Sequence, residues 1–224
     1  MTPILRVEFH CHTSASKDCL TSPRRLVQAC QRKGIDRVVI TDHNTLGGAQ
    51  RAQEIDPERV IVGEEIMTAK GELLAAFVQE EIPKGLPAME AIERLRAQGA
   101  FISVSHPFDE YRHGGWKLPD LAEIIPYVDA IETYNARCLR SEFNTRAQDY
   151  ARQRGLLGTV GSDAHTAFEL GQAVLLLAPF SDAASLKAAL RQGQAVCRPS
   201  GAWVHMTSRL AVWYKLLFHP REFK

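Results

Sequence analysis

Histidines and carboxylates recur in this sequence at spacings that suit metal binding. His10 and His12 lie two residues apart in FHCHT, so on an extended strand both imidazoles leave the same face and can grip one ion. GSDAH repeats this i, i+2 arrangement far along the chain, with Asp163 and His165. One such pair is weak evidence, but two pairs in a small protein favour a metal site.

Further candidates follow other apolar runs. In TDHNT, Asp42 and His43 are adjacent and would leave a strand in opposite directions. We therefore expect His43 to be a ligand and Asp42 to orient a histidine through its other ring nitrogen, with a helix cap as the alternative for Asp42. Glu64 and Glu65 follow a run that should be buried, where a carboxylate needs a cation or hydrogen-bond donors. Side-chain alternation alone does not choose between these two glutamates.

Two isolated residues have ordinary alternatives. His106 ends the apolar run FISVS, and a lone histidine there is more often a hydrogen-bonded core residue than a ligand. Because other candidate ligands are present in the same sequence, we nevertheless expect His106 to be a metal ligand. Asp18 lies in a serine-containing loop, where its pattern fits a turn residue as well as a ligand.

The elements that must position these residues alternate along the chain between short apolar runs and helical patterns. This rhythm predicts a mainly parallel sheet covered by helices, either a barrel or an open doubly wound sheet. The expected strands are Ile4–Phe9, Arg37–Thr41, Val60–Met67, Leu73–Gln79, Ala100–Ser105, Ala130–Thr133, Gly158–Gly161 and Val174–Leu177. The expected helices are Pro23–Lys33, Gly48–Glu54, Ala88–Gln98, Leu121–Ile125, Arg140–Arg154 and Asp182–Gln192. Almost every expected strand ends in a His, Asp or Glu, which is where barrel enzymes place their chemistry.

The composition is that of a soluble globular domain. The 224 residues carry a formal net charge of +1, so no overall field attracts a polyanion, and no basic stripe with interleaved aromatic residues predicts extended duplex binding. The five cysteines form no CxxC pair, which favours a reducing compartment. The N-terminus lacks the apolar stretch of a signal peptide, and no run is long enough to span a bilayer. We expect a cytoplasmic protein without a transmembrane segment.

The motifs FHCHT, TDHNT, GEEI, SHPFD and GSDAH together resemble the PHP (polymerase and histidinol phosphatase) family of metal-dependent phosphoesterases. The match runs in order from His10 to about Gly171, and SHPFD and YNAR resemble the compact stand-alone branch of that family. The resemblance implies an α/β fold, a distorted (β/α)7 TIM-like barrel over residues 1–200, with two or three divalent ions (Mn, Zn or Fe) at the carboxyl ends of its strands.

The ligand set that the resemblance implies is carried over residue by residue. The first metal takes His10, His12, Glu65 and Asp163, the second shares Glu65 and adds His106, and the third takes Asp18, His43 and His165. The Gly-x-Glu motif of the family falls on Gly63 and Glu65, which favours Glu65 over Glu64. Many members carry a histidine where this chain has Glu72. A glutamate ligand there would tilt the second site towards Mn or Fe, and without it a two-metal centre is the better expectation.

The implied reaction is hydrolysis of a phosphate ester by a metal-bound hydroxide, on a small phosphorylated molecule, a nucleotide or a short oligonucleotide. Arg137 in YNAR is expected to bind a phosphoryl oxygen, and Arg112 or His113 to contact the leaving group. The alternatives are an amidohydrolase-like hydrolase of a non-phosphate ester or amide, and a non-catalytic, metal-stabilised accessory domain. The lack of an obvious metal-bridging lysine disfavours the former, and the nearly full ligand set disfavours the latter.

Residues 201–224 form a separate tail in this interpretation. Its segment Trp203–Phe223 mixes aromatic and aliphatic residues with basic ones. We expect a final helix that packs on the barrel, with a membrane-surface helix or a contact in a homo-oligomer as the alternative.

Overall fold

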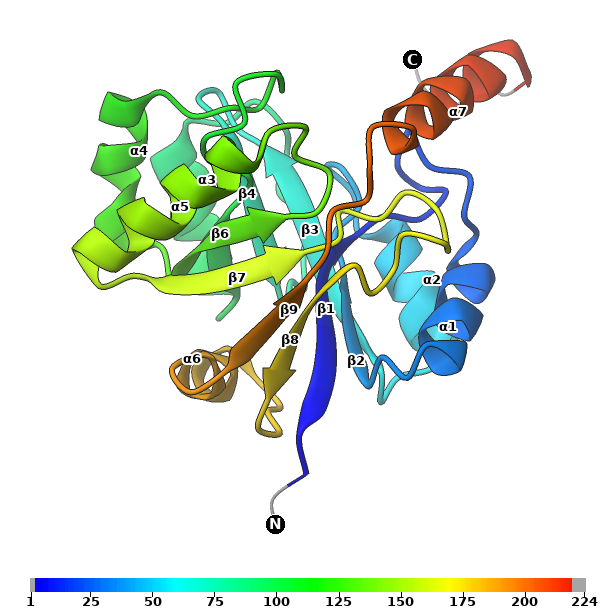
Figure 1. The fold of residues 1–224 in the computed structure, drawn as a ribbon, viewed down its shortest axis with the longest axis horizontal. Coiled ribbons are helices and arrows are strands. Elements are labelled where there is room, and N and C mark those ends of the chain that lie inside the picture. Colours follow the sequence, from blue (N-terminus) through cyan, green and yellow to red (C-terminus); the bar gives the residue numbers. More distant parts are fainter. Residues whose placement is uncertain (1–2, 219–224) are drawn as a thin grey trace.

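The computed structural model describes residues 3–218, in which one curved sheet is surrounded by helices (Figure 1). The strands are β1 (Leu5–Cys11), β2 (Arg37–Ile40), β3 (Val60–Met67), β4 (Glu72–Ala76), β5 (Phe101–Val104), β6 (Ala130–Asn135), β7 (Leu157–Gly161), β8 (Ala173–Leu177) and β9 (Gln194–Cys197). The helices are α1 (Pro23–Arg32), α2 (Gly47–Ile55), α3 (Ala88–Ala97), α4 (Leu118–Ile124), α5 (Ser141–Arg154), α6 (Ala183–Leu190) and α7 (Val204–Phe218), with a 3-10 turn at Ile125–Tyr127.

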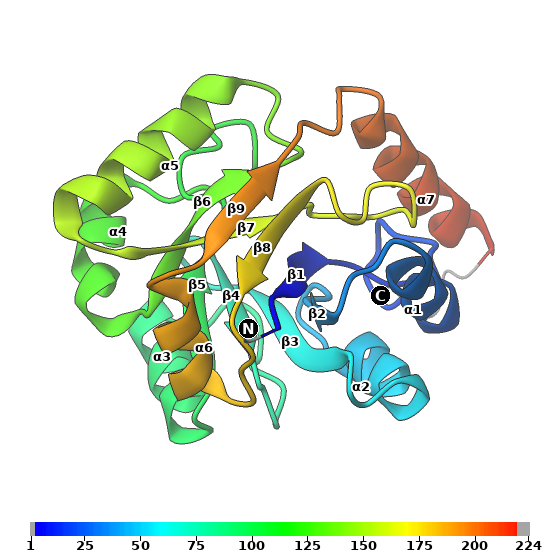
Figure 2. The same cartoon turned by 60° about the horizontal axis from the view of Figure 1, so that its bottom comes forward.

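The sheet curls into a nearly closed barrel, as the resemblance implied. Its strand order is β7-β6-β5-β4-β3-β2-β1-β8-β9, and β1 also lies against β7 (Figure 2). The seam between them is joined by a bridge from Cys11 to Ala164, where the His12 N–H donates to the Ala164 carbonyl at 2.9 Å. The backbones approach so closely that a Cβ at Gly161 would overlap the Cβ of His10, so only glycine fits there.

The expectation of a mainly parallel sheet was wrong. β4 runs antiparallel to both β3 and β5, and β8 runs antiparallel to β1 and β9. The cause at β4 is a tight turn, Thr68–Gly71, because a connection this short permits only a hairpin. Since β4 runs backwards, its first residue, Glu72, pairs with the last residue of β3, Met67. The first residue of β4 therefore lies at the same end of the barrel as the carboxyl ends of the parallel strands.

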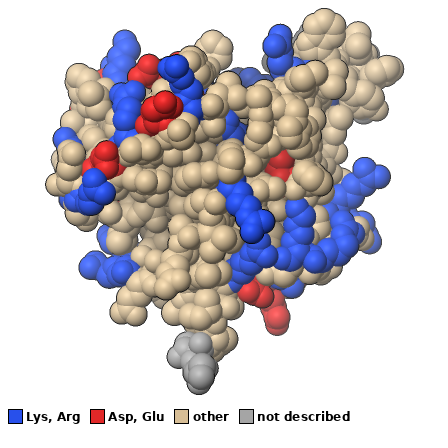
Figure 3. Space-filling view, in the orientation of Figure 1, with Lys and Arg blue, Asp and Glu red and all other residues tan. Residues whose placement is uncertain are grey.

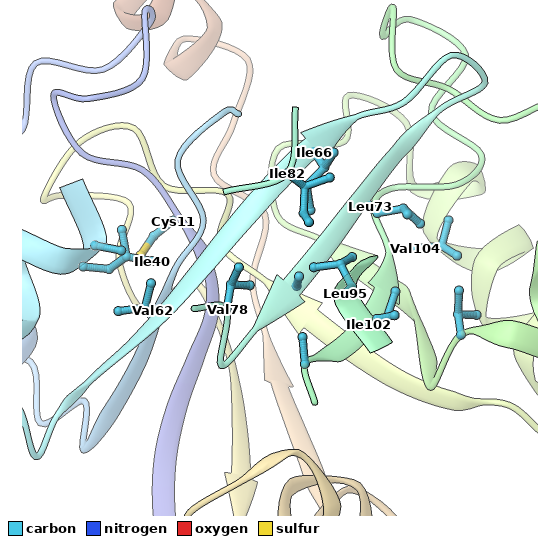
Figure 4. Close-up of a cluster of buried hydrophobic side chains, with 14 of the residues drawn as sticks. Cys11, Ile40, Val62, Ile66, Leu73, Val78, Ile82, Leu95, Ile102 and Val104 are labelled. Carbon is cyan, nitrogen blue, oxygen red and sulfur yellow. The ribbon is translucent and has the colours of Figure 1, made fainter. Parts of the chain in front are cut away.

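Apart from β9, the strands are largely buried on both faces, which explains their near-continuous apolar sequences. Val38 and Ile40 of β2 face a core shared with α1, α2 and α3, and Figure 4 shows part of this core. Val39 and Ile61 belong to a second core, to which α6 contributes Leu186 and Leu190. These apolar cores hold the strands that carry the polar side chains of the site.

The expected helices are all present, with ends shifted by a few residues. β9 was not predicted, because it is a short and largely exposed strand. The tail forms α7, and its predicted part beyond Phe218 lies outside the described residues. Across residues 3–218, no helix combines the length and apolar character needed to traverse a bilayer.

Candidate metal centre

The structure gathers every predicted metal ligand at one end of the barrel. His10 and His12 come from the end of β1 and the loop after it, and Glu65 from β3. The others are Asp18 in the loop after β1, His43 after β2, Glu72 at the start of β4, His106 after β5, and Asp163 and His165 after β7. Residues from opposite ends of the sequence therefore meet in one cluster.

Glu65 lies at the middle of this cluster. Its Oε2 is 3.3 Å from His10 Nε2, 3.5 Å from His12 Nε2 and 3.1 Å from His43 Nδ1. Its Oε1 is 3.2 Å from His106 Nε2. One carboxylate thus faces four imidazoles, which is the arrangement of a bridging ligand.

Two aspartates complete the cluster on either side. Asp163 Oδ1 lies 3.2 Å from His12 Nε2 and 3.6 Å from His10 Nε2. Asp18 Oδ2 lies 3.1 Å from His165 Nε2 and 3.6 Å from His43 Nε2. Three groups have ligand atoms within 4.8 Å of one another: His10, His12 and Asp163; His12, His43 and His165; and His43, Glu65 and Glu72.

Glu72 joins the cluster from the reversed strand. Its Oε2 is 3.4 Å from His106 Nε2, and its Oε1 is 3.9 Å from His43 Nδ1. A Cβ at Gly114 would overlap the Glu72 carboxylate, so the glycine leaves space for it. This placement supports Glu72 as the counterpart of the histidine that many family members carry.

The two adjacent glutamates of β3 point to opposite faces of the sheet. Glu64 is buried away from the cluster, and its Oε2 accepts a hydrogen bond from the Ile82 N–H at 3.0 Å. Burial raises the pKa of Glu64 to about 8. Of these two glutamates, only Glu65 is therefore placed to bind an ion at the mouth of the barrel.

The unpaired atoms of the cluster fit divalent cations. Within the described part of the chain, several buried side-chain atoms there make no hydrogen bond: Nε2 of His10, His12 and His165, Oε2 of Glu65, Oδ1 of Asp163 and Oδ1 of Asp18. Leaving so many buried polar atoms without partners is very costly unless a cation binds them. Mixed imidazole and carboxylate donors suit Zn, Mn or Fe.

A glutamate that sequence reasoning missed orients His10. Glu132 Oε1 is 2.8 Å from His10 Nδ1, which leaves Nε2 free for an ion. Its Oε2 accepts from the His106 N–H at 2.9 Å, so one side chain positions two ligands. Glu132 lies in the expected strand Ala130–Thr133, and the argument that a buried carboxylate needs a partner would have identified it.

Asp42 acts through a serine rather than directly on a histidine. It accepts hydrogen bonds at 2.6 Å from the Thr13 N–H, the Thr13 hydroxyl and the Ser16 hydroxyl. Ser16 Oγ in turn lies 3.2 Å from His12 Nδ1 and accepts from the His43 N–H at 3.1 Å. The helix-cap alternative is excluded, because α2 begins after Leu46 and has no side-chain cap.

The two predicted arginines have different surroundings. Arg137 is buried, and all three guanidinium nitrogens contact protein atoms: Nε donates to Glu169, Nη1 lies 3.1 Å from His165 Nδ1, and Nη2 donates to the Val204 carbonyl. Most of its donors are therefore engaged by protein atoms, which disfavours phosphate binding by Arg137, and that role stays a prediction. Arg112 reaches the cluster, with Nη2 2.6 Å from Asp163 Oδ2, whereas His113 is exposed on the same loop.

Charge within the cluster sets the protonation of its histidines. Burial lowers the pKa of His43, but Glu65 and Asp18 outweigh it and raise the pKa to about 10. Burial also opposes protonation of His10, and carboxylates led by Glu65 and Asp163 raise its pKa well above the usual value. By contrast, the pKa of His12 is lowered to about 3, mainly because the ring is buried and also because His165 and His43 carry positive charge nearby.

Metal binding to the metal-free protein is expected to release protons. At pH 7.5, His10 and His43 hold protons because their pKa values are raised, and a ligand imidazole must give its proton up. We expect about two protons released, and an affinity that increases with pH until His43 is neutral near pH 10. Calorimetry in buffers of different ionisation enthalpy measures this number. His43→Ala should release fewer protons and His113→Ala the same number, and binding without proton release contradicts the expectation.

Comparison with known proteins agrees with this geometry. Residues 8–115 match the model of the PHP domain, and residues 141–195 match that of a PHP-associated segment. An uncharacterized protein of Methanocaldococcus jannaschii is 37% identical over 175 residues, which are 76% of this chain and 70% of the relative. A second one from the same organism is 33% identical over 146 residues, covering 59% and 82% of the two chains.

Solved structures share the fold at low sequence identity. PsfC from Pseudomonas syringae superposes with a TM-score of 0.68 at 18% identity, over 96% of this chain and 99% of that one. A candidate metal-dependent phosphoesterase from Bifidobacterium adolescentis gives 0.61 at 19% identity, over 87% and 98%. The lesion-specific endonuclease EndoQ from Pyrococcus furiosus gives 0.61 at 13% identity, over 86% of this chain and 58% of EndoQ.

The PHP match contains the candidate ligands from His10 to His106, and the PHP-associated match contains Asp163 and His165. Together the two matches span most of the barrel. The family and the ligand cluster support a metal-dependent hydrolase. The chain belongs to the PHP family.

Proposed function

We propose that this protein is a phosphoesterase that hydrolyses a small phosphate ester, a nucleotide or a short oligonucleotide. The observation that carries the proposal is the convergence of buried, unpartnered imidazole and carboxylate atoms at the mouth of the barrel. His10, His12, Glu65 and Asp163 would hold a first ion, Glu65, Glu72 and His106 a second, and Asp18, His43 and His165 a third. When bound, such ions supply a nucleophile from water at neutral pH and stabilise phosphoryl oxygens.

The surroundings of the cluster favour an anion of modest size. Arg112 lies against Asp163 and lines a cavity of about 210 Å³, together with Phe108, Trp116 and Arg146. Away from the cluster, Figure 3 shows Lys and Arg side chains, with few Asp or Glu among them, where the outer helices α1 and α2 lie in Figure 1. In this proposal Arg112 turns from Asp163 to a phosphoryl oxygen, and the cavity receives the leaving group.

Model substrates test the reaction class. With Mn²⁺, the protein is expected to cleave p-nitrophenyl phosphate or bis-p-nitrophenyl phosphate in preference to p-nitrophenyl acetate. The ratio of the two phosphate rates separates monoester from diester hydrolysis. Preferential cleavage of the acetate would instead support an amidohydrolase-like enzyme. Full metal occupancy with no turnover on any substrate would support a non-catalytic domain.

Removal of Glu72 tests the second site alone. Glu72→Ala is expected to lose one bound ion, because His106 and Glu65 would then be the only remaining donors proposed for that site. Elemental analysis of protein purified without chelators gives the stoichiometry. Glu72→His, which restores the residue of many family members, should recover the ion. An unchanged metal content in Glu72→Ala would show that Glu72 is not a ligand.

A further inference from the structure

The C-terminal helix α7 is held to the barrel in an unusual way. Its buried residues, Val204, Ala211 and Lys215, recur at helical spacing along one face, with Ser208 on the same stripe. Most of its large apolar side chains are exposed, including Trp213 at 69% and Leu217 at 71%. Little apolar surface therefore attaches this helix, and its polar contacts must do so.

The first polar contact is a buried lysine. Lys215 is only 5% exposed, and its Nζ donates to the Ser14 carbonyl at 2.8 Å and to the Ser16 carbonyl at 2.5 Å. Burying an ammonium group is costly without such partners, so these contacts fix the loop and the helix relative to each other. The same loop carries Asp18, and the Ser16 hydroxyl lies beside His12 and His43.

The second polar contact is Arg137. Its Nη2 donates to the Val204 carbonyl at 2.7 Å and to Ser208 Oγ at 3.0 Å, in the first turns of α7. Its Nη1 lies 3.1 Å from His165 Nδ1, and its Nε donates to Glu169, which also accepts from the His165 N–H. The loop that carries His165 is thereby joined to α7.

The two contacts both support ligands of the proposed third ion site. Lys215 fixes the loop of Asp18, and Arg137 fixes His165, whose Nε2 is 3.1 Å from Asp18 Oδ2. His10 is held instead by Glu132 and Asp163 by the barrel seam, whereas His12 lies in β1's following loop and also contacts Ser16 Oγ at 3.2 Å. We propose that α7 positions the site of Asp18, His43 and His165 through Lys215 and Arg137, and that the other ion sites depend on it much less. The inference rests on the proposed multi-ion centre.

Replacement of Lys215 tests this division. Lys215→Met removes the ammonium group with little change in length, and Arg209→Met on the exposed side of α7 is the matched control. By comparison with other groups that orient metal ligands, we expect one Mn²⁺ equivalent to bind roughly 10- to 100-fold more weakly in Lys215→Met. The remaining equivalents should be weakened much less than this one, and the control should match the parent. Lys215→Arg, which keeps a buried cation, should recover part of the loss.

Hydrogen exchange on the unaltered protein provides a test that does not need the variant to fold. α7 supplies no proposed ligand, yet Mn²⁺ should slow amide exchange in residues 204–218, because binding and helix docking are coupled reciprocally. Exchange in α7 that is indifferent to Mn²⁺, or full stoichiometry and affinity in folded Lys215→Met, would overturn the inference. A parent protein that binds no Mn²⁺ would instead refute the proposed metal centre itself.

Discussion

Replacement of Glu65 by glutamine is expected to reduce the proposed phosphoesterase turnover by roughly 10²- to 10³-fold, because charge-stabilising groups at an active centre contribute effects of this order. Glu65 lies within 3.5 Å of a ring nitrogen of each of four histidines, which are His10, His12, His43 and His106. The amide keeps the volume of the side chain but loses its negative charge. We expect the metal content to fall as well, since the proposed first and second ions share this residue.

The neighbouring glutamate supplies the control. Glu64 is equally buried and adjacent in sequence, but it faces the opposite side of β3. Glu64→Gln should therefore keep the metal content and turnover of the parent. Elemental analysis measures the metal content of both variants, and steady-state kinetics measures their turnover. Equal losses in the two variants, or full activity in Glu65→Gln, would place the chemistry elsewhere.

Removal of the ions is expected to destabilise the fold strongly. A ligand that binds only the folded state at 1,000 times its Kd adds about 4 kcal/mol per site to the free energy of unfolding. For a chain of this size, that corresponds to a fall in Tm of roughly 10 °C per site. Several buried atoms of the cluster make no hydrogen bond within the described residues, so a bound ion would stabilise the folded state there.

Thermal unfolding with and without a chelator measures this effect. The parent protein should unfold at a markedly lower temperature after chelation and recover when Mn²⁺ is added in excess. Glu65→Gln should show a smaller difference between the two conditions, because it starts with fewer ions. A Tm that is the same with and without chelator would mean that the cluster is stable without cations.

The local part of the site could be predicted from the sequence because strand geometry is regular. The i, i+2 spacing of His10 and His12 brings their rings to one face, with centroids 5.1 Å apart. Alternation alone did not choose between Glu64 and Glu65, since the choice depends on which face of β3 points to the mouth. The family motif resolved it, and the structure places Glu65 in the cluster.

The long-range part could not be predicted in the same way. Strand direction at β4 depends on the turn Thr68–Gly71, and an apolar run reads the same in either direction. The partners of Arg137 come from α7 and from the loop after β7, which no local pattern connects with YNAR. A buried arginine with structural partners therefore resembles, in sequence, an arginine that is free to bind a substrate.

A bound cation would link two parts of the chain that are far apart in sequence and meet at the seam of the barrel. His10 and His12 stand on one side of the Cys11–Ala164 bridge, and Asp163 and His165 stand on the other. An ion shared across this line fastens the first strand to a segment near the far end of the chain, as a cross-link closes a long loop. With such an ion bound, β1 and β7 would separate only if coordination bonds also broke, so opening of the barrel would require loss of the ion.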